Sequence, residues 1–168
     1  MSATPELEQR RVISEITEAL TQLLGRDVKL ASGKGPEPTE LVIRYVDGEG
    51  DLISAWTIER HLAFSLGAAL TMVPRAIVEQ SLQGGDDQAQ LKENFHEVCN
   101  VLATTAANLL NRRSKLESVS PDRQELLRTA RQIRANGGHW SVFELAIDGY
   151  AGGRMAVSFA HPDEQPPD

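Results

Sequence analysis

The stretch QAQLKENFHEVCNVLATTAANLLN, residues 88–111, is the longest segment of this chain with helical periodicity. Its apolar residues recur at a helical spacing and form one stripe, made of Leu91, Phe95, Val98, Leu102, Ala106 and Leu109. We expect that stripe to face the core. The opposite side is polar and carries Glu93, Glu97, Asn100, Thr104 and Asn111. Residues 88–111 are therefore predicted to form a long helix with one buried face and one exposed face.

The segments on either side of this helix show helical spacing or strand alternation. We expect further helices at residues 8–24, 59–72, 75–82 and 121–135. We expect strands at residues 27–32, 41–46, 52–58, 115–119, 139–147 and 154–159. Two glycine-rich stretches, DGEGD at 47–51 and DGYAGG at 148–153, are typical of the turns of β-hairpins.

The order helix, strand, proline-bearing loop and hairpin occurs twice, over residues 8–60 and again over residues 88–160. The sequence YVDG at 45–48 is echoed by AIDG at 146–149. Two similar halves indicate an internal duplication with a pseudo-two-fold arrangement. We therefore predict one α+β domain over residues 8–160, with an antiparallel sheet and long helices packed on one face of it. Residues 1–7 and 161–168 are expected to be disordered tails.

The formal net charge is −7. This argues against a nucleic-acid-binding protein, because the neutralisation of phosphates requires clustered Lys and Arg. No apolar run approaches the roughly 20 residues of a membrane span, and no signal pattern opens the sequence, so a cytoplasmic protein is expected. The single cysteine, Cys99, lies among apolar neighbours and is expected to be an inert core thiol.

The polar side of the long helix is the candidate functional surface. Glu97 and Asn100 are three residues apart, so their side chains are neighbours on one ridge. Ala103 and Ala107 flank this ridge with small side chains that would let another protein approach closely. The alternative is an ordinary solvated surface, because a Glu-x-x-Asn sequence also arises by chance on exposed helices.

The run EVCNVLATTAANLL, residues 97–110, resembles the signature helix of the CheC/CheX/FliY family of response-regulator phosphatases. Two further stretches resemble the same family: SVSP at 118–121, after the strand that follows the helix, and TQLLGRDV at 21–28, at the end of the first helix. The resemblance covers roughly residues 8–160. The family often has Asp or Ser four residues before the Glu, where this sequence has Glu93.

The resemblance also implies that one repeat has lost its site. When the second helix is aligned with the first, Leu7 and Arg10 occupy the places of Glu and Asn. The chain would then carry a single site, which makes it most similar to CheX within the family.

The function implied by the resemblance is a phosphatase that hydrolyses the aspartyl phosphate of a CheY-like response regulator, in chemotaxis or another two-component pathway. Asn100 would orient the attacking water, and Glu97 would pair with the regulator's lysine. The chain would need no cofactor of its own, because the receiver domain supplies Mg²⁺. The expected docking residues are Glu93, Ala103, Thr104 and Ala107.

Two other functions remain open. The same fold serves as a non-catalytic binding or scaffolding module that docks a receiver domain or a flagellar-switch component. A homodimeric regulator, paired through exposed hairpin edges, is a third reading and is compatible with catalysis, because CheX-like relatives form dimers.

Overall fold

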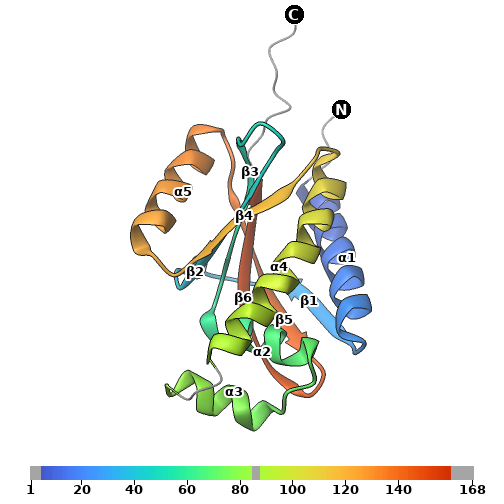
Figure 1. The fold of residues 1–168 in the computed structure, drawn as a ribbon. Helices are drawn as coiled ribbons and strands as arrows, with labels where there is room; N and C mark the ends of the chain where they lie inside the picture. The colour runs from blue at the N-terminus through green and yellow to red at the C-terminus, as the bar shows by residue number, and fades with distance from the viewer. Residues whose placement is uncertain (1–4, 85–87, 160–168) are drawn as a thin grey trace, which may run out of the picture.

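A six-stranded sheet forms the centre of the molecule, in the order β1-β5-β6-β3-β2-β4, and every neighbouring pair is antiparallel (Figure 1). The structure is a computed structural model that describes residues 5–84 and 88–159. The strands are β1 (Val28–Ser32), β2 (Leu41–Val46), β3 (Leu52–Ile58), β4 (Lys115–Ser120), β5 (Trp140–Ile147) and β6 (Tyr150–Phe159). The helices are α1 (Pro5–Leu24), α2 (Arg60–Leu70), α3 (Arg75–Leu82), α4 (Gln88–Leu110) and α5 (Arg123–Ala135).

The strand order confirms the predicted internal duplication. If each strand of the first half is exchanged with its counterpart in the second half (β1 with β4, β2 with β5, β3 with β6), the order reads the same in reverse. The β2–β3 hairpin then matches the β5–β6 hairpin, and β3 pairs with β6 across the centre. The fold is therefore α+β with two related halves, and α1 and α4 are the equivalent long helices.

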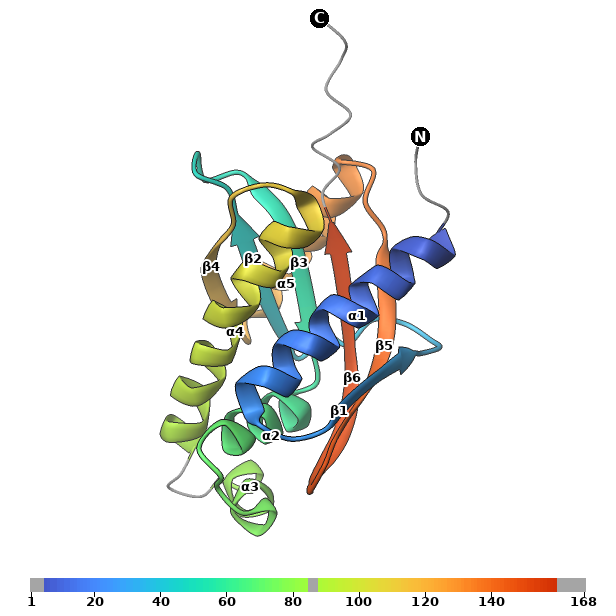
Figure 2. The same ribbon diagram turned by 90° about the vertical axis from the view of Figure 1, so that its right-hand side faces the viewer.

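The two long helices pack on the same face of the sheet, as predicted (Figure 2). The largest cluster of buried residues lies between them and the sheet. It includes Ile16 and Leu20 of α1, Phe95 and Val98 of α4, and Trp56 of β3, none of them more than 3% exposed. Burial of these large side chains supplies most of the driving force that holds the layers together.

The shorter helix α5 packs on the opposite face of the sheet (Figure 1). Its buried Ile133 belongs to a small apolar cluster with Leu52 and Ala55 of β3, and Trp140 of β5 packs against that cluster. The sheet is therefore covered on its second face over β2 and β3, and both of these strands are buried along nearly their whole length. The long amphipathic helices alone did not predict this second layer.

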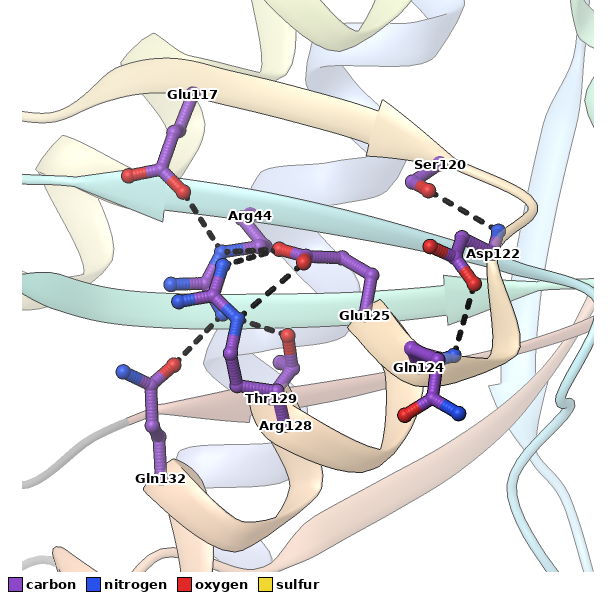
Figure 3. A network of polar contacts seen from close by, with 9 residues as sticks. All are labelled: Arg44, Glu117, Ser120, Asp122, Gln124, Glu125, Arg128, Thr129 and Gln132. Atoms are coloured by element: carbon purple, nitrogen blue, oxygen red, sulfur yellow. Dashed lines mark hydrogen bonds and ion pairs between the residues drawn. The ribbon is translucent and has the colours of Figure 1, made fainter.

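A buried arginine fastens α5 to β2 (Figure 3). The side chain of Arg44 is 3% exposed, and its Nε lies 2.8 Å from Glu117 Oε1 and 3.2 Å from Glu125 Oε1. Its Nη1 donates hydrogen bonds to Thr129 Oγ1 (2.6 Å) and Gln132 Oε1 (2.7 Å). Two carboxylates and two neutral acceptors therefore compensate the cost of burying the guanidinium group.

Two element boundaries differ from the prediction by three or more residues. The helix α1 begins at Pro5, so residues 5–7, which we expected in a disordered tail, are helical; a proline is well tolerated in the first turn of a helix. Residues 1–4 and the expected tail 161–168 lie outside the described residues. The strand β6 begins at Tyr150 instead of 154, because Tyr150 pairs with Ile147 and leaves residues 148–149 as the whole turn.

The glycines that suggested a longer turn have another role. A Cβ atom on Gly153 would lie 2.9 Å from the Cβ of Leu62, so this glycine lets α2 pack closely on β6. The hairpin strands are also all internal, because β2 and β5 each have a neighbour on both sides. A dimer paired through hairpin edges is therefore excluded, and the open edges of the sheet are β1 and β4.

A close approach between α2 and α4 sets the position of α4. A Cβ atom on Gly67 would lie 2.5 Å from the carbonyl oxygen of Leu91 and 3.1 Å from the backbone nitrogen of Phe95. Only a glycine at this position allows the two helix backbones to come so near. The helix α4 thus rests on α2 as well as on the sheet.

The Gly67→Ala variant is expected to be less stable by about 1–3 kcal/mol, because the added methyl group overpacks a contact with backbone atoms and outweighs the gain in helix propensity. Urea unfolding followed by circular dichroism measures this. Gly48→Ala is the matched control, since nothing lies within 4 Å of a Cβ at Gly48. Equal midpoints for the two variants would contradict the close packing of α2 on α4.

Removal of the buried arginine is also expected to lower the stability of the fold. Arg44→Ala leaves the carboxylate of Glu117 without its partner and leaves Glu125 paired only with Arg128. Because it also removes a buried side chain that makes four polar contacts, we expect a loss of about 3–5 kcal/mol of unfolding free energy. Arg75→Ala, in the exposed ion pair with Glu79 (56% and 60% exposed), should change stability by less than about 1 kcal/mol. Similar urea midpoints for both variants would show that the network does not fasten α5.

Candidate functional site

A ridge of polar side chains runs along the outer face of α4. Glu93, Glu97, Asn100 and Thr104 are all exposed, as the helical periodicity predicted. We call these four residues the α4 ridge. The residues between them on the inner face, including Phe95, Val98 and Leu102, are buried against the sheet and the neighbouring helices. The burial of one stripe therefore determines which side chains point outward.

Glu97 and Asn100 lie side by side on this ridge, one helical turn apart. Both are exposed, and neither side chain has a hydrogen bond or ion pair with any residue in 5–84 or 88–159. Their polar groups are therefore available to a partner molecule. A carboxylate accepts hydrogen bonds or pairs with a cation, whereas a carboxamide both donates and accepts without carrying charge.

Buried hydrogen bonds hold the backbone of α4 beneath the ridge. The Tyr45 hydroxyl group donates to the carbonyl oxygen of Cys99 at 2.9 Å. The Asn94 amide donates to the carbonyl oxygen of Gly67 (3.0 Å) and to Thr71 Oγ1 (2.9 Å), and it accepts from Gln90 Nε2 (2.8 Å). Sequence reasoning missed Asn94. Its signal was a polar residue beside Phe95 at a position that helical periodicity places next to the buried stripe.

The C-terminal end of α4 is fixed from two directions. Arg11 of α1 donates from its guanidinium group to the carbonyl oxygens of Asn108 (2.7 Å) and Leu109 (3.2 Å), which have no partner within the helix. Arg112, just past the helix, pairs with Asp47 at 2.8 Å. Hydrogen bonds from the backbone N–H groups of Asp51 and Glu49 lower the pKa of Asp47, and the charge of Arg112 adds to this effect.

The two alanines expected to flank the ridge lie in different surroundings. Ala107 is half-buried at the edge of the ridge. Ala103 is only 8% exposed and packs in the main core, so the expectation that it forms part of a docking surface is wrong. The reason is helical geometry: Ala103 follows the buried Cys99 by four residues and precedes the buried Ala106 by three.

A shallow open groove of about 450 Å³ lies beside the ridge, between α1 and α4. Its lining comes from both helices and comprises Glu15, Glu18, Ala19, Gln22, Leu23, Val101, Thr104, Thr105 and Asn108. Thr104 belongs both to the ridge and to the groove, so the two surfaces are continuous. Sequence reasoning did not predict the groove, because α1 and α4 are brought together only by the tertiary fold.

Neither a metal centre nor a membrane span is present in the part of the chain that the structure describes. No group of three or more His, Cys, Asp or Glu side chains there could hold a metal ion. No helix among these residues is both long and apolar enough to cross a membrane.

No protein-family model matches the sequence, and no curated protein matches it. Solved structures do resemble the fold. FliY of Thermotoga maritima is 15% identical, with a TM-score of 0.56 over 95% of this chain and 92% of that one. The FliM middle domain of Vibrio alginolyticus is 12% identical, with a TM-score of 0.59 over 93% and 92%.

A third structure is the complex of CheX with CheY, BeF3 and Mg²⁺ from Borrelia burgdorferi, whose match is 10% identical with a TM-score of 0.50 over 90% of this chain and 96% of that one. The chain therefore has the fold that FliY, the FliM middle domain and CheX share, as the sequence resemblance implied. The expectation that CheX is its nearest relative within this group is not confirmed, since the scores with FliY and FliM are higher.

The buried thiol offers a test of how firmly α4 is packed. Cys99 is 0% exposed, and burial raises the pKa of its thiol far above the usual value. We expect no measurable reaction with Ellman's reagent in the folded protein at pH 8, and one thiol per chain after unfolding in urea. Rapid labelling of the folded protein would show that α4 opens readily from the core.

Proposed function

We propose that this chain is a phosphatase that docks on a CheY-like receiver domain and accelerates hydrolysis of its aspartyl phosphate. One observation carries the proposal: Glu97 and Asn100 stand side by side on the exposed face of a firmly packed helix, with no partner among the described residues. A rigid helix can deliver both groups together into a partner's site, because neither has to be released from a contact within the chain.

The reaction requires little of the helper protein. The oxygen of a water molecule attacks phosphorus in line, and the bond between phosphorus and the aspartyl oxygen breaks. The products are inorganic phosphate and a free aspartate carboxylate. The barrier depends on placing that water and on stabilising charge on the phosphoryl oxygens. In this proposal the receiver provides Mg²⁺ and a lysine, and this chain provides the position of the water.

Asn100 has the chemistry to position the water. Its carboxamide oxygen can accept a hydrogen bond from the water, while its amide group can donate one to a neighbouring oxygen. Because the side chain is neutral, it can lie beside an anionic phosphoryl group without repulsion. A carboxylate at the same place would be repelled by the phosphoryl oxygens.

Glu97 is assigned a different role. Its carboxylate lies one turn before Asn100 and, in this proposal, pairs with the lysine of the receiver, which fixes the orientation of α4 in the partner's site. Glu93, Thr104 and Ala107 lie along the same helix face and are proposed to contact the receiver around that pair.

The likeness to solved structures supports the choice of partner. The structure of CheX from Borrelia burgdorferi contains CheY, BeF3 and Mg²⁺. By analogy we propose a chemotaxis or related two-component role for this chain. A cytoplasmic location follows from the proposal, because receiver domains act there.

The FliM middle domain favours a second candidate function, a docking module without catalysis, because its TM-score of 0.59 is above that of CheX. Such a module would bind a receiver or a flagellar-switch component and leave the lifetime of the phosphate unchanged. The two candidate functions differ in whether the bound chain accelerates loss of phosphate from the receiver.

Asn100→Ala is expected to lower the rate of dephosphorylation at saturating chain by about 10²-fold, the scale of losing one preorganised polar group. The half-saturating concentration should stay nearly unchanged, because Glu97 and the rest of the face remain. The measurement is the decay of a stand-alone receiver, phosphorylated with acetyl phosphate and Mg²⁺, taken from the genome that encodes this chain.

The matched control is Gln80→Ala, which removes an exposed carboxamide from α3 and should leave the decay unchanged. Binding of the phosphorylated receiver without any acceleration by the unmodified chain would favour the docking module. If the Asn100→Ala variant binds more weakly but keeps the full rate in the bound state, then Asn100 does not position the water in the reaction.

A further inference from the structure

The groove between α1 and α4 continues the α4 ridge toward α1. Figure 2 shows the two helices side by side on one face of the sheet. Val101, a groove residue, is one turn after Glu97 on the same helix face, and Thr105 and Asn108 follow it at helical spacing. A protein whose site receives Glu97 and Asn100 would therefore cover the groove as well. The groove is thus placed to contact the same partner.

The charge of the groove is of one sign. Its ionisable lining residues are Glu15 and Glu18 of α1, and Glu93 and Glu97 follow on the ridge. Neither Glu15 nor Glu18 has an ion pair or side-chain hydrogen bond with any residue in the described part of the chain. The nearby cation Arg11 donates to the carbonyl oxygens at the end of α4 and forms no ion pair with Glu15. The two carboxylates therefore have no ion-pair partner among the residues that the structure describes.

The groove also offers apolar contacts and one unpartnered hydroxyl group. Ala19 and Leu23 of α1 face it together with Val101 of α4, which is 39% exposed although it is a large apolar side chain. Thr105 is only 4% exposed, and it forms no hydrogen bond with another described residue. Its hydroxyl oxygen is not fully buried, so it can bond to water or to a molecule bound in the groove.

We propose that this groove is a docking site for a segment of the receiver domain that carries a lysine or arginine next to an apolar side chain. The cation would lie between Glu15 and Glu18, and the apolar side chain would pack on Val101 and Leu23. This inference rests on the proposed function, and it adds that the groove is the surface that selects the receiver. The net charge of −7 disfavours a second copy of the chain as the occupant, and the acidic lining disfavours anionic lipid or nucleic acid.

The test uses the double variant Glu15→Lys/Glu18→Lys in the full chain. We expect the half-saturating concentration for the acetyl-phosphate-treated receiver to rise about tenfold, which is the scale of two exposed ion pairs, while the rate at saturation stays unchanged. The Glu15→Gln/Glu18→Gln variant should give a smaller rise in the same direction. Added salt should weaken binding to the unmodified chain more than binding to the Gln variant.

The matched control is Glu49→Lys/Glu144→Lys, which changes the net charge by the same amount at exposed positions on the β2–β3 turn and on β5. Circular dichroism and urea unfolding check that each variant is folded. An unchanged half-saturating concentration for both groove variants, with full activity of the unmodified chain, would overturn the docking site alone. A rise equal to that of the control would show a general charge effect and would also overturn it.

The proposed function fails in a different way. If the unmodified chain neither binds the phosphorylated receiver nor accelerates its decay, both the function and the groove inference are wrong. The chain could bind the receiver without accelerating loss of its phosphate. In that case, weaker binding by the groove variants, together with the larger effect of salt on the unmodified chain, still supports the docking site. The rate at saturation therefore reports on Asn100, and the half-saturating concentration reports on the groove.

Discussion

The burial of one apolar stripe of α4 is the constraint on which the rest of the site depends. Phe95, Val98 and Leu102 are buried along the inner face of α4. The close approach at Gly67 also packs α2 against the backbone of α4. With its inner face fixed, the helix has no freedom to rotate, so Glu97 and Asn100 must point outward. A pair of groups held in this way loses little conformational entropy when it enters a partner's site.

The internal duplication explains why the site has two parts. The pseudo-two-fold relation between the halves places α1 and α4 side by side on one face of the sheet. Two equivalent helices would present two equivalent surfaces, but the sequence of α1 contains no asparagine. Instead, α1 contributes Glu15 and Glu18 to the groove. In our proposals one helix of the pair carries the reaction and the other helps to select the partner.

The buried charge of the molecule is compensated, whereas the carboxylates of the proposed site are not. Arg44 is buried on the face that α5 covers, where Glu117, Glu125, Thr129 and Gln132 accept from it or pair with it, and this network serves the stability of the fold (Figure 3). On the opposite side, the carboxylates of the ridge and groove have no partner among the described residues. Unpaired charges at a surface contribute little to folding and remain available for recognition.

The sequence by itself determined the elements and the outward direction of Glu97 and Asn100, because hydrophobic periodicity is a local property that burial directly enforces. It predicted an exposed position for Ala103, which is buried. This residue lies at the border of the buried stripe, where periodicity alone does not distinguish buried from exposed positions. It also missed Asn94, Arg44 and the groove. Only the tertiary structure decided these, because their partners lie far away in the chain and the packing of the halves brings them together.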